Sequence, residues 1–309
     1  MAAQMRHILC IAGPTASGKS ARAVEEALAR GGEIISVDSR QVYRGLDIGT
    51  EKITPEEMRG IPHHLIDIRD ARENYSAGDF VTDATRLIKE ISGRGKFPIL
   101  VGGTHFYFDA LLRGLPSGIN ENQELRAALE TYSTEELYLR VRETDTRRAA
   151  ELDPKNRRRL IRALEIIDSL GHVPPRPENT PPFGTRLNLV EYEVEWIVVD
   201  PEREELRAKI DARLASAIAR GLIDEVRKVR ERVGDQRLNE LGLEYRVIGE
   251  FLRLNVNLAV SPPSQNRTEA ALVPTLSAKL WQYARRQSAW LRKLRRELIA
   301  EAPSRPDKN

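Results

Sequence analysis

Near its N-terminus the chain reads Gly13-Pro14-Thr15-Ala16-Ser17-Gly18-Lys19-Ser20, which is a complete phosphate-binding loop. An apolar run at 8–12 precedes this loop and helix-forming residues at 21–28 follow it, as the motif requires. The backbone N–H groups of such a loop form a nest for an anion, and the helix N-terminus and Lys19 add positive charge. The Ser20 hydroxyl is placed to reach Mg²⁺. The segment therefore predicts a binding site for a phosphate or diphosphate group.

The first hundred residues alternate between short apolar runs and helical patterns, which is typical of a parallel sheet with crossover helices. The expected strands lie at 7–12, 33–37, 64–68 and 97–101. The expected helices lie at 19–30, at 77–92, and after Thr104 up to about Arg113. We predict an α/β fold in which a P-loop NTPase-like parallel sheet is flanked by helices.

The middle of the chain follows a different pattern. Residues 117–171 contain no strand-like run and read as several short helices, the last at 157–170. A proline-rich linker separates them from a strand-like run at 189–199. The remaining expected helices lie at 201–220, 222–232, 238–254 and about 268–299, with a loop at 259–265. We therefore predict an all-helical insertion domain at 117–185, within a core formed by 1–116 and 186–309.

Composition narrows the class of protein. The 309 residues are 40% hydrophobic and 31% charged, which is typical of a soluble globular chain. No apolar run approaches the roughly 18 residues that a membrane span needs, and residues 1–7 are too short and polar for a signal peptide. The lone cysteine, Cys10, excludes an internal disulfide and is expected to be buried in the first strand. We expect a cytoplasmic protein.

The formal net charge is only +3, but the basic residues gather in two stretches. The first contains Arg140, Arg142, Arg147, Arg148, Lys155, Arg157, Arg158, Arg159 and Arg162. The second contains Arg285, Arg286, Arg292, Lys293, Arg295 and Arg296. Charge runs are commonly solvated faces. Beside a phosphate-binding loop they favour a surface for a polyanion.

Three further residues are candidates for chemistry. Asp38 ends the second expected strand, where ligands of open α/β sheets bind, so its carboxylate could accept a proton or hold Mg²⁺. The alternative is that Asp38 or Ser39 caps a helix. Thr104 follows the glycine turn after the fourth strand and offers a hydroxyl. Arg213 could clamp a departing pyrophosphate or lie on a solvated helix face.

Taken together, these segments resemble the tRNA dimethylallyltransferase family, also called tRNA isopentenylpyrophosphate transferases. The resemblance runs through nearly the whole chain. It is carried by GPTASGKS at 13–20, ISVDSRQVYRGLDIGTEK at 35–52, PHHLIDI at 62–68, YSAGDF at 75–80, LVGGTHFYFDALLRGLP at 100–116, NRRRLIRALEI at 156–166 and QYARRQSAWLRK at 282–293. Several such blocks in the same order are far more specific than any one of them.

The resemblance implies transfer of a dimethylallyl group from its diphosphate to N6 of adenosine 37 in tRNA, next to the anticodon. By analogy Asp38 is the general base, and residues 13–20 bind the diphosphate through Thr15, Lys19 and Ser20. Ser20 also lies near Mg²⁺, and Arg213 stabilises the departing pyrophosphate. The loop would then serve a prenyl diphosphate and not ATP.

The resemblance also implies contacts with the tRNA anticodon stem-loop. The matching positions are Asp38, Ser39, Arg40, Gln41, Thr104, Arg158, Arg159, Arg162, Arg286 and Gln287. Gln41 could pair with the Watson–Crick edge of a base. Single-stranded loops make base extrusion cheap, which suits an acceptor beside the anticodon. We expect a monomer that acts on tRNA and dimethylallyl diphosphate, away from membranes.

One segment departs from the family pattern, since Gly242-Leu243-Glu244-Tyr245-Arg246 stands where a Gly-Tyr-Lys/Arg-Glu/Gln motif is usual. Three alternatives remain from the residues alone. An adenylate isopentenyltransferase shares the fold and chemistry but takes a free nucleotide. A P-loop kinase for a small molecule would use the same loop for ATP. A non-catalytic RNA-binding protein would keep only the basic surfaces.

Overall fold

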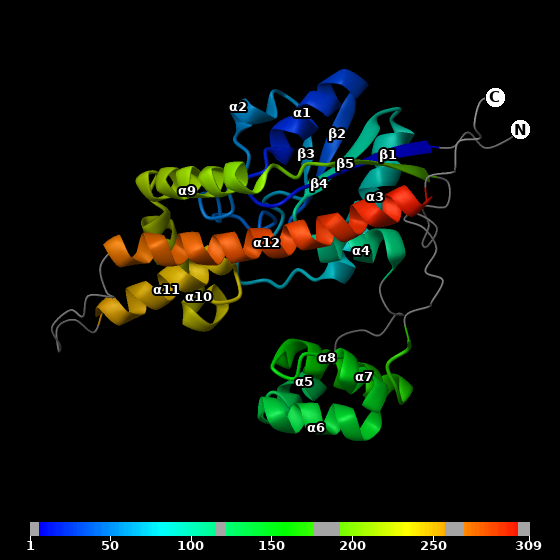
Figure 1. Ribbon diagram of the computed structural model, residues 1–309, viewed down its shortest axis with the longest axis vertical. Coiled ribbons are helices and arrows are strands. Elements are labelled where there is room, and N and C mark those ends of the chain that lie inside the picture. The colour runs from blue at the N-terminus through cyan, green and yellow to red at the C-terminus, as the bar shows by residue number, and fades with distance from the viewer. Residues whose placement is uncertain (1–5, 115–121, 176–191, 257–268, 302–309) are drawn as a thin grey trace, which may run out of the picture. The chain divides into compact units, whose positions relative to one another are not determined.

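The computed structural model describes residues 6–114, 122–175, 192–256 and 269–301 (Figure 1). The chain divides into two compact units, one formed by Met1–Arg113 with Pro181–Asn309 and the other by Gly114–Thr180. The predicted domain boundaries at 116/117 and 185/186 lie outside the described residues, as does the predicted loop at 259–265. Among the described helices, none is both long and apolar enough to cross a membrane.

The first unit is built on a five-stranded sheet whose described strands all pair in parallel. The strands are β1 (Arg6–Ala12), β2 (Gly32–Val37), β3 (His63–His64), β4 (Phe97–Gly102) and β5 (Tyr192–Val198), in the order β3-β2-β4-β1-β5. From Ile8 to Ala12 both faces of β1 are buried, which explains the continuous apolar run there. Cys10 lies buried and free in this strand, as predicted, and burial raises the pKa of its thiol. The parallel sheet confirms the predicted fold class.

The prediction of a strand at 64–68 was wrong, because only His63–His64 is extended. Leu65 (φ 62°) and Asp67 (φ 56°) adopt left-handed backbone conformations, which break a strand. The predicted start of the last strand, at 189–191, lies outside the described residues.

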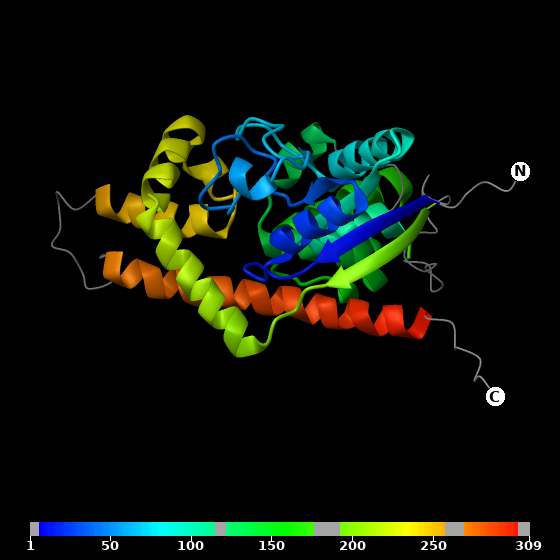
Figure 2. The same ribbon diagram turned by 90° about the horizontal axis from the view of Figure 1, so that it is seen from above.

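Helices cover both faces of the sheet, and Figure 2 shows α12 running alongside it. On one face, Ala23, Val24 and Ala27 of α1 pack on apolar side chains of β1, β2 and β4. The opposite face packs with α3, α4 and α12. The helices of this unit are α1 (Lys19–Arg30), α2 (Pro55–Met58), α3 (Ala77–Gly93), α4 (His105–Arg113), α9 (Arg203–Ala219), α10 (Leu222–Leu238), α11 (Leu243–Val256) and α12 (Glu269–Glu301).

The ends of several helices follow local signals. Gly31 (φ 62°) ends α1 in the left-handed conformation that glycine favours. Ser76 starts α3 with a capping box that pairs it with Asp79. The helix predicted at 222–232 extends to Leu238 across a break at Gly234 (φ 75°, ψ 171°). The next helix begins at Leu243, later than predicted.

The second unit contains its own apolar core, and its described residues form helices and no strand. Side chains at 137, 141, 160 and 161 meet in this core. Asn122, Ser133, Asp145 and Asn156 each accept a hydrogen bond at a helix N-terminus. The helices are α5 (Gln123–Leu129), α6 (Thr134–Thr144), α7 (Thr146–Glu151) and α8 (Arg157–Leu170).

Candidate active site

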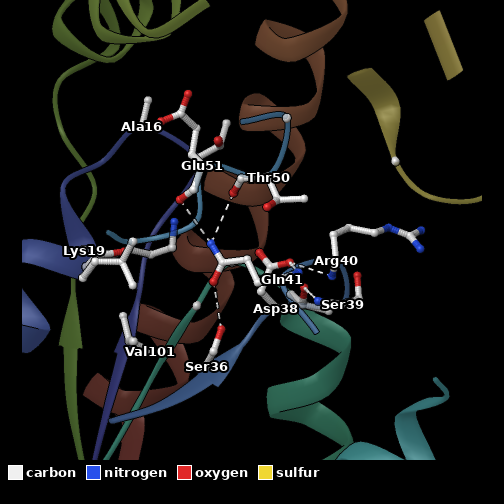
Figure 3. Close-up of a pocket in the computed structure, with 18 of the residues that line it drawn as sticks. Ala16, Lys19, Ser36, Asp38, Ser39, Arg40, Gln41, Thr50, Glu51 and Val101 are labelled. Atoms are coloured by element: carbon white, nitrogen blue, oxygen red, sulfur yellow. Dashed lines mark hydrogen bonds between the residues drawn. The ribbon is translucent and has the colours of Figure 1, made fainter. Parts of the chain in front are cut away.

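A cavity of about 360 Å³ opens at the carboxyl ends of β2 and β4 in the first unit (Figure 3). Its walls come from the phosphate-binding loop, the turns after these two strands, a loop at 49–53, residues 241–245 and two side chains of α12. In parallel α/β sheets this edge is where ligands bind. The cavity thus brings together segments that are far apart in the sequence.

The phosphate-binding loop forms the floor of the cavity with a conformation that depends on its glycines. A Cβ at Gly13 would meet Ser17 Oγ at 2.5 Å and the carbonyl of Val199 at 2.7 Å, so no side chain fits there. Gly18 (φ 88°) precedes α1 in the left-handed region. The buried Ser17 Oγ has no hydrogen-bond partner among the described residues. A buried polar atom without a partner is costly, which fits a loop that awaits an anion.

Lys19 points its ammonium group toward the same space. Its Nζ donates to the carbonyl of Pro14 at 3.2 Å. Burial lowers the pKa of Lys19 to about 8, with Arg213 adding to the effect and Asp38 opposing it. An anionic ligand in the loop would offset the cost of burying this charge. Lys19 is therefore suited to hold a negatively charged group.

Asp38 lies just after β2, with its carboxylate held by a backbone turn. Its Oδ1 accepts hydrogen bonds from the N–H groups of Arg40 at 2.8 Å and Gln41 at 3.2 Å. No helix begins here, so the alternative of a helix cap at Asp38 or Ser39 was wrong. The second oxygen, Oδ2, accepts no hydrogen bond from a described residue. Asp38 is therefore a fixed carboxylate, and its Oδ2 is available to accept a proton.

The neighbours of Asp38 are also tied into the protein. Thr104 Oγ1 accepts a hydrogen bond from the Ser39 N–H at 3.2 Å, which joins the turns after β2 and β4. The Gln41 side chain lines the cavity with its amide bonded to protein atoms (Figure 3). These hydrogen bonds keep the turn after β2 in one arrangement beside the cavity.

Arg213 of α9 enters the cavity, so the alternative of a solvated face was wrong. Its guanidinium donates to Thr15 Oγ1. Two carboxylates stand near the guanidinium: Glu51, 3.6 Å from Nε, and Glu244, 3.9 Å from one terminal nitrogen. Burial, together with Asp38 and Glu51, raises the pKa of Glu244, while Arg213 opposes the shift. The unusual segment at 242–246 therefore supplies a wall of the site.

Gln287 of α12 is only 4% exposed and lines the cavity. Its predicted contact with tRNA stays a prediction, restricted to a base that enters the cavity. Its Oε1 accepts from the Thr15 N–H at 2.9 Å, and its Nε2 donates to the Gly103 carbonyl at 2.9 Å. The helix position of Gln287 fixes which face it presents, and that face is internal. The neighbouring Arg286 is exposed, as a tRNA contact would need.

The predicted basic residues of α8 belong to the second unit. Arg158 and Arg159 are exposed there. Arg162 is half-buried and donates to Glu165 at 3.1 Å. Glu165 is itself 1% exposed, so this pairing lies partly within the core of the unit.

Sequence reasoning missed Glu51, Glu244 and Tyr283 as parts of the site. Tyr283 lies one helical turn before Gln287 and so shares its face of α12. That spacing is a signal from which Tyr283 could have been found. Desolvation of its hydroxyl, with Asp38 and Glu244 nearby, raises the pKa of Tyr283 to about 12, while the residue as a whole is 39% exposed.

Comparison with known proteins gives a consistent picture. The model of the family described as IPP transferase matches residues 41–294. A tRNA dimethylallyltransferase of Thermomicrobium roseum is 39% identical over 93% of this chain and 84% of its own length. A tRNA dimethylallyltransferase of Roseiflexus sp. (strain RS-1) is 40% identical over 93% of this chain and 90% of its own length.

Solved structures are similar as well. The full-length tRNA isopentenylpyrophosphate transferase of Bacillus halodurans is 37% identical with a TM-score of 0.65, over 93% of this chain and 87% of that one. A eukaryotic dimethylallyltransferase acting on tRNA is 28% identical with a TM-score of 0.73, and the match covers 93% of this chain and 70% of that chain.

Proposed function

The chain belongs to the IPP transferase family and is a tRNA dimethylallyltransferase, and we propose that it moves the dimethylallyl group of dimethylallyl diphosphate to N6 of adenosine 37, next to the anticodon. One observation carries this proposal: a single cavity contains the phosphate-binding loop, Lys19, Arg213 and the carboxylate of Asp38. The first three suit a leaving diphosphate and the fourth suits an amine that loses a proton.

The donor side of the reaction depends on charge. Lys19, Arg213 and the N-terminus of α1 surround the position of the diphosphate, with the Thr15 hydroxyl beside them. Negative charge builds on the diphosphate as the allylic C–O bond breaks, and preorganised donors stabilise that charge. The allylic carbon develops cationic character, so the reaction needs water kept away from it while the donor is bound.

The cofactor proposed for the site is Mg²⁺, bound by the Ser20 hydroxyl. Ser20 is exposed and lines the cavity. Among the described residues there is no group of three or more His, Cys, Asp or Glu that could hold a metal ion. Mg²⁺ commonly uses one or two protein ligands together with substrate phosphates, so the residues present fit it. Bound there, the ion would neutralise part of the diphosphate charge.

On the acceptor side, Asp38 receives the proton. The N6 amine of adenosine attacks the allylic carbon, the C–O bond to the diphosphate breaks, and the diphosphate leaves with the electron pair. The amine then gives its proton to the available oxygen of Asp38, which is held in place through Oδ1. Gln41 lies beside Asp38; its Nε2 donates to the carbonyls of Thr50 and Glu51, so its Oε1, which accepts from Ser36, keeps one lone pair to accept from the N6 amine of an extruded base.

The proposed partner is the anticodon stem-loop of tRNA, held by exposed arginines such as Arg159 and Arg286. We expect the protein to act as a monomer in the cytoplasm, where this substrate is present. The names of the relatives favour tRNA over the free nucleotide of an adenylate isopentenyltransferase and over a kinase.

An acceptor competition tests the proposal. Labelled dimethylallyl diphosphate is mixed with the protein and either unmodified tRNA, AMP or ATP. We expect label in tRNA and none in the nucleotides. Label in AMP alone would identify an adenylate isopentenyltransferase, and phosphorylation of a small acceptor from ATP would identify a kinase.

A further inference from the structure

The carboxylate of Glu225, in the first turn of α10, accepts four hydrogen bonds. Its Oε2 accepts from the N–H groups of Asp47 at 2.9 Å and Ile48 at 2.7 Å. Its Oε1 accepts from the Gly49 N–H at 2.9 Å and the Tyr245 hydroxyl at 2.6 Å. A carboxylate has about four acceptor sites, so this one is fully used. A single side chain of α10 therefore holds three successive amides of the loop at 47–51.

The loop has little freedom to take another position. A Cβ on Gly49 would come within 2.8 Å of the Tyr245 ring, so the backbone lies directly against that buried ring. Burial and the nearby Glu225 raise the pKa of Tyr245, so its hydroxyl stays a donor. Glu51 has a φ of 50°, a left-handed conformation that persists only where the surroundings enforce it. The loop is thus held in a strained state.

The same loop fixes the side chain of Gln41 (Figure 3). The carbonyls of Thr50 and Glu51 accept hydrogen bonds from Gln41 Nε2 at 3.2 and 3.3 Å. Gln41 Oε1 accepts from Ser36 Oγ at 3.0 Å. The amide oxygen therefore faces Ser36 and the amide nitrogen faces the loop. The backbone N–H of Gln41 also donates to Asp38 Oδ1 at 3.2 Å. A continuous set of contacts therefore runs from α10 to the carboxylate in the cavity.

We propose that Glu225 is a positioning residue for prenyl transfer, which holds the loop at 47–51 so that this loop orients the Gln41 amide beside Asp38 for the acceptor base. The inference rests on the proposed function, because it takes that base to lie next to Asp38. The phosphate-binding loop has a separate anchor in Gln287, through the Thr15 N–H. The loop at 47–51 also carries Glu51, 3.6 Å from Arg213 Nε, but Arg213 keeps two further partners in Thr15 and Glu244, so we expect the main effect of Glu225 on the acceptor side of the reaction.

Glu225→Gln tests the proposal, since it keeps the shape but turns an NH₂ group toward N–H and O–H donors. We expect kcat for tRNA prenylation to fall about 10- to 100-fold, because small misplacements of a reacting group have effects of this size. The Kd of dimethylallyl diphosphate, measured by calorimetry, should stay within about twofold of the original value. Asp224→Asn is the matched control, because Asp224 is an exposed neighbour that pairs with Arg227, and it should change neither quantity.

A double-mutant cycle separates positioning from general stability. If Glu225 acts through Gln41, then adding Glu225→Gln to Gln41→Ala should change kcat by less than about twofold. If Glu225 only stabilised the fold, Glu225→Gln would lower the thermal midpoint and the fraction of active protein. The apparent kcat would then fall by the same factor in the unsubstituted protein and in Gln41→Ala. Equal losses of kcat in the two backgrounds, or an unchanged kcat in folded Glu225→Gln, would overturn the inference.

Two milder variants keep the test decisive if Glu225→Gln does not fold. Tyr245→Phe removes one of the four donors, and Glu225→Asp keeps the charge on a shorter side chain. Both should lower kcat in the same acceptor-specific way by a smaller factor, about two- to fivefold for Tyr245→Phe. Unchanged kcat in both variants would overturn the inference. A protein that prenylates no tRNA before any substitution would instead contradict the proposed function itself.

Discussion

The guanidinium of Arg213 donates a hydrogen bond to Thr15 Oγ1, which links α9 to the phosphate-binding loop across 198 residues of sequence. Glu51 and Glu244 flank the same guanidinium, so its position is set before any ligand binds. A preorganised cation of this kind stabilises charge that develops on a leaving group. The relationship accounts for how a helix that follows the last strand takes part in the site.

Replacing Arg213 should therefore act on the chemical step. We expect Arg213→Ala to lower kcat about 10²- to 10³-fold, the effect of removing one donor from such a site. Arg213→Lys should recover only part of the loss, because an ammonium group does not reproduce the geometry of the guanidinium. Steady-state kinetics with tRNA checks this. Lys209→Ala is the control on α9, because Lys209 is exposed and pairs with Glu205, and it should match the unsubstituted protein.

Donor binding should depend on pH through Lys19, whose pKa is lowered to about 8. Below pH 8 the group is charged and attracts the diphosphate, and above pH 8 the free protein holds it neutral. Between about pH 7, where the diphosphate is fully ionised, and pH 8 the Kd of dimethylallyl diphosphate should be constant, and above pH 8 it should rise by up to about tenfold per pH unit. Calorimetry across this range measures it. Lys19→Gln should bind weakly with a flat profile, and a sloping profile in that variant would assign the effect to another group.

Removing the amide of Gln287 should loosen the phosphate-binding loop. Gln287→Ala leaves the Thr15 N–H and the Gly103 carbonyl without their partner. Each unsatisfied group costs about 1–3 kcal/mol, so the two together should lower the free energy of unfolding by about 2–6 kcal/mol. Denaturant unfolding measures the loss, and donor binding should weaken in parallel. Gln282→Ala, at an exposed position of α12, should change neither; an equal loss there would indicate a general effect on the helix.

Binding of tRNA should weaken steeply with salt. If Arg159 and Arg286 contact phosphates, replacing either one by Ala should reduce the slope of log K against log[salt] by about one. Filter binding at several salt concentrations measures the slope. Arg86→Ala serves as the control, because Arg86 pairs with Glu90 on α3, and its slope should be unchanged. Unaltered slopes for Arg159→Ala and Arg286→Ala would remove these residues from the interface.

Local patterns predicted much of the fold and part of the site. The phosphate-binding loop is one contiguous motif, and the helices Lys19–Arg30 and Arg157–Leu170 have the predicted bounds because their caps and periodicity are local. The strand expected at 64–68 failed because apolar spacing does not reveal a left-handed residue such as Leu65.

Such local patterns could not predict contacts between segments that are distant in the sequence. Gln287 meets the Thr15 N–H only because α12 packs across the turns after β1 and β4, so its buried state depends on the whole fold. The same holds for Glu225, which carries no local signal that it would bind the amides of a loop near Asp38. For Arg213 the sequence left two possibilities, a pyrophosphate clamp or a solvated helix face, and only the placement of its helix in the fold excludes the second.

Nucleoside mass spectrometry tests most directly whether the cavity couples a leaving diphosphate to proton removal by Asp38. Unmodified tRNA is incubated with dimethylallyl diphosphate and either the unsubstituted protein or Asp38→Asn, and then digested and analysed. The account predicts N6-dimethylallyladenosine from position 37, formed about 10²- to 10⁴-fold more slowly by Asp38→Asn, which should still bind tRNA. No such nucleoside from the unsubstituted protein, or an equal rate from Asp38→Asn, would contradict it.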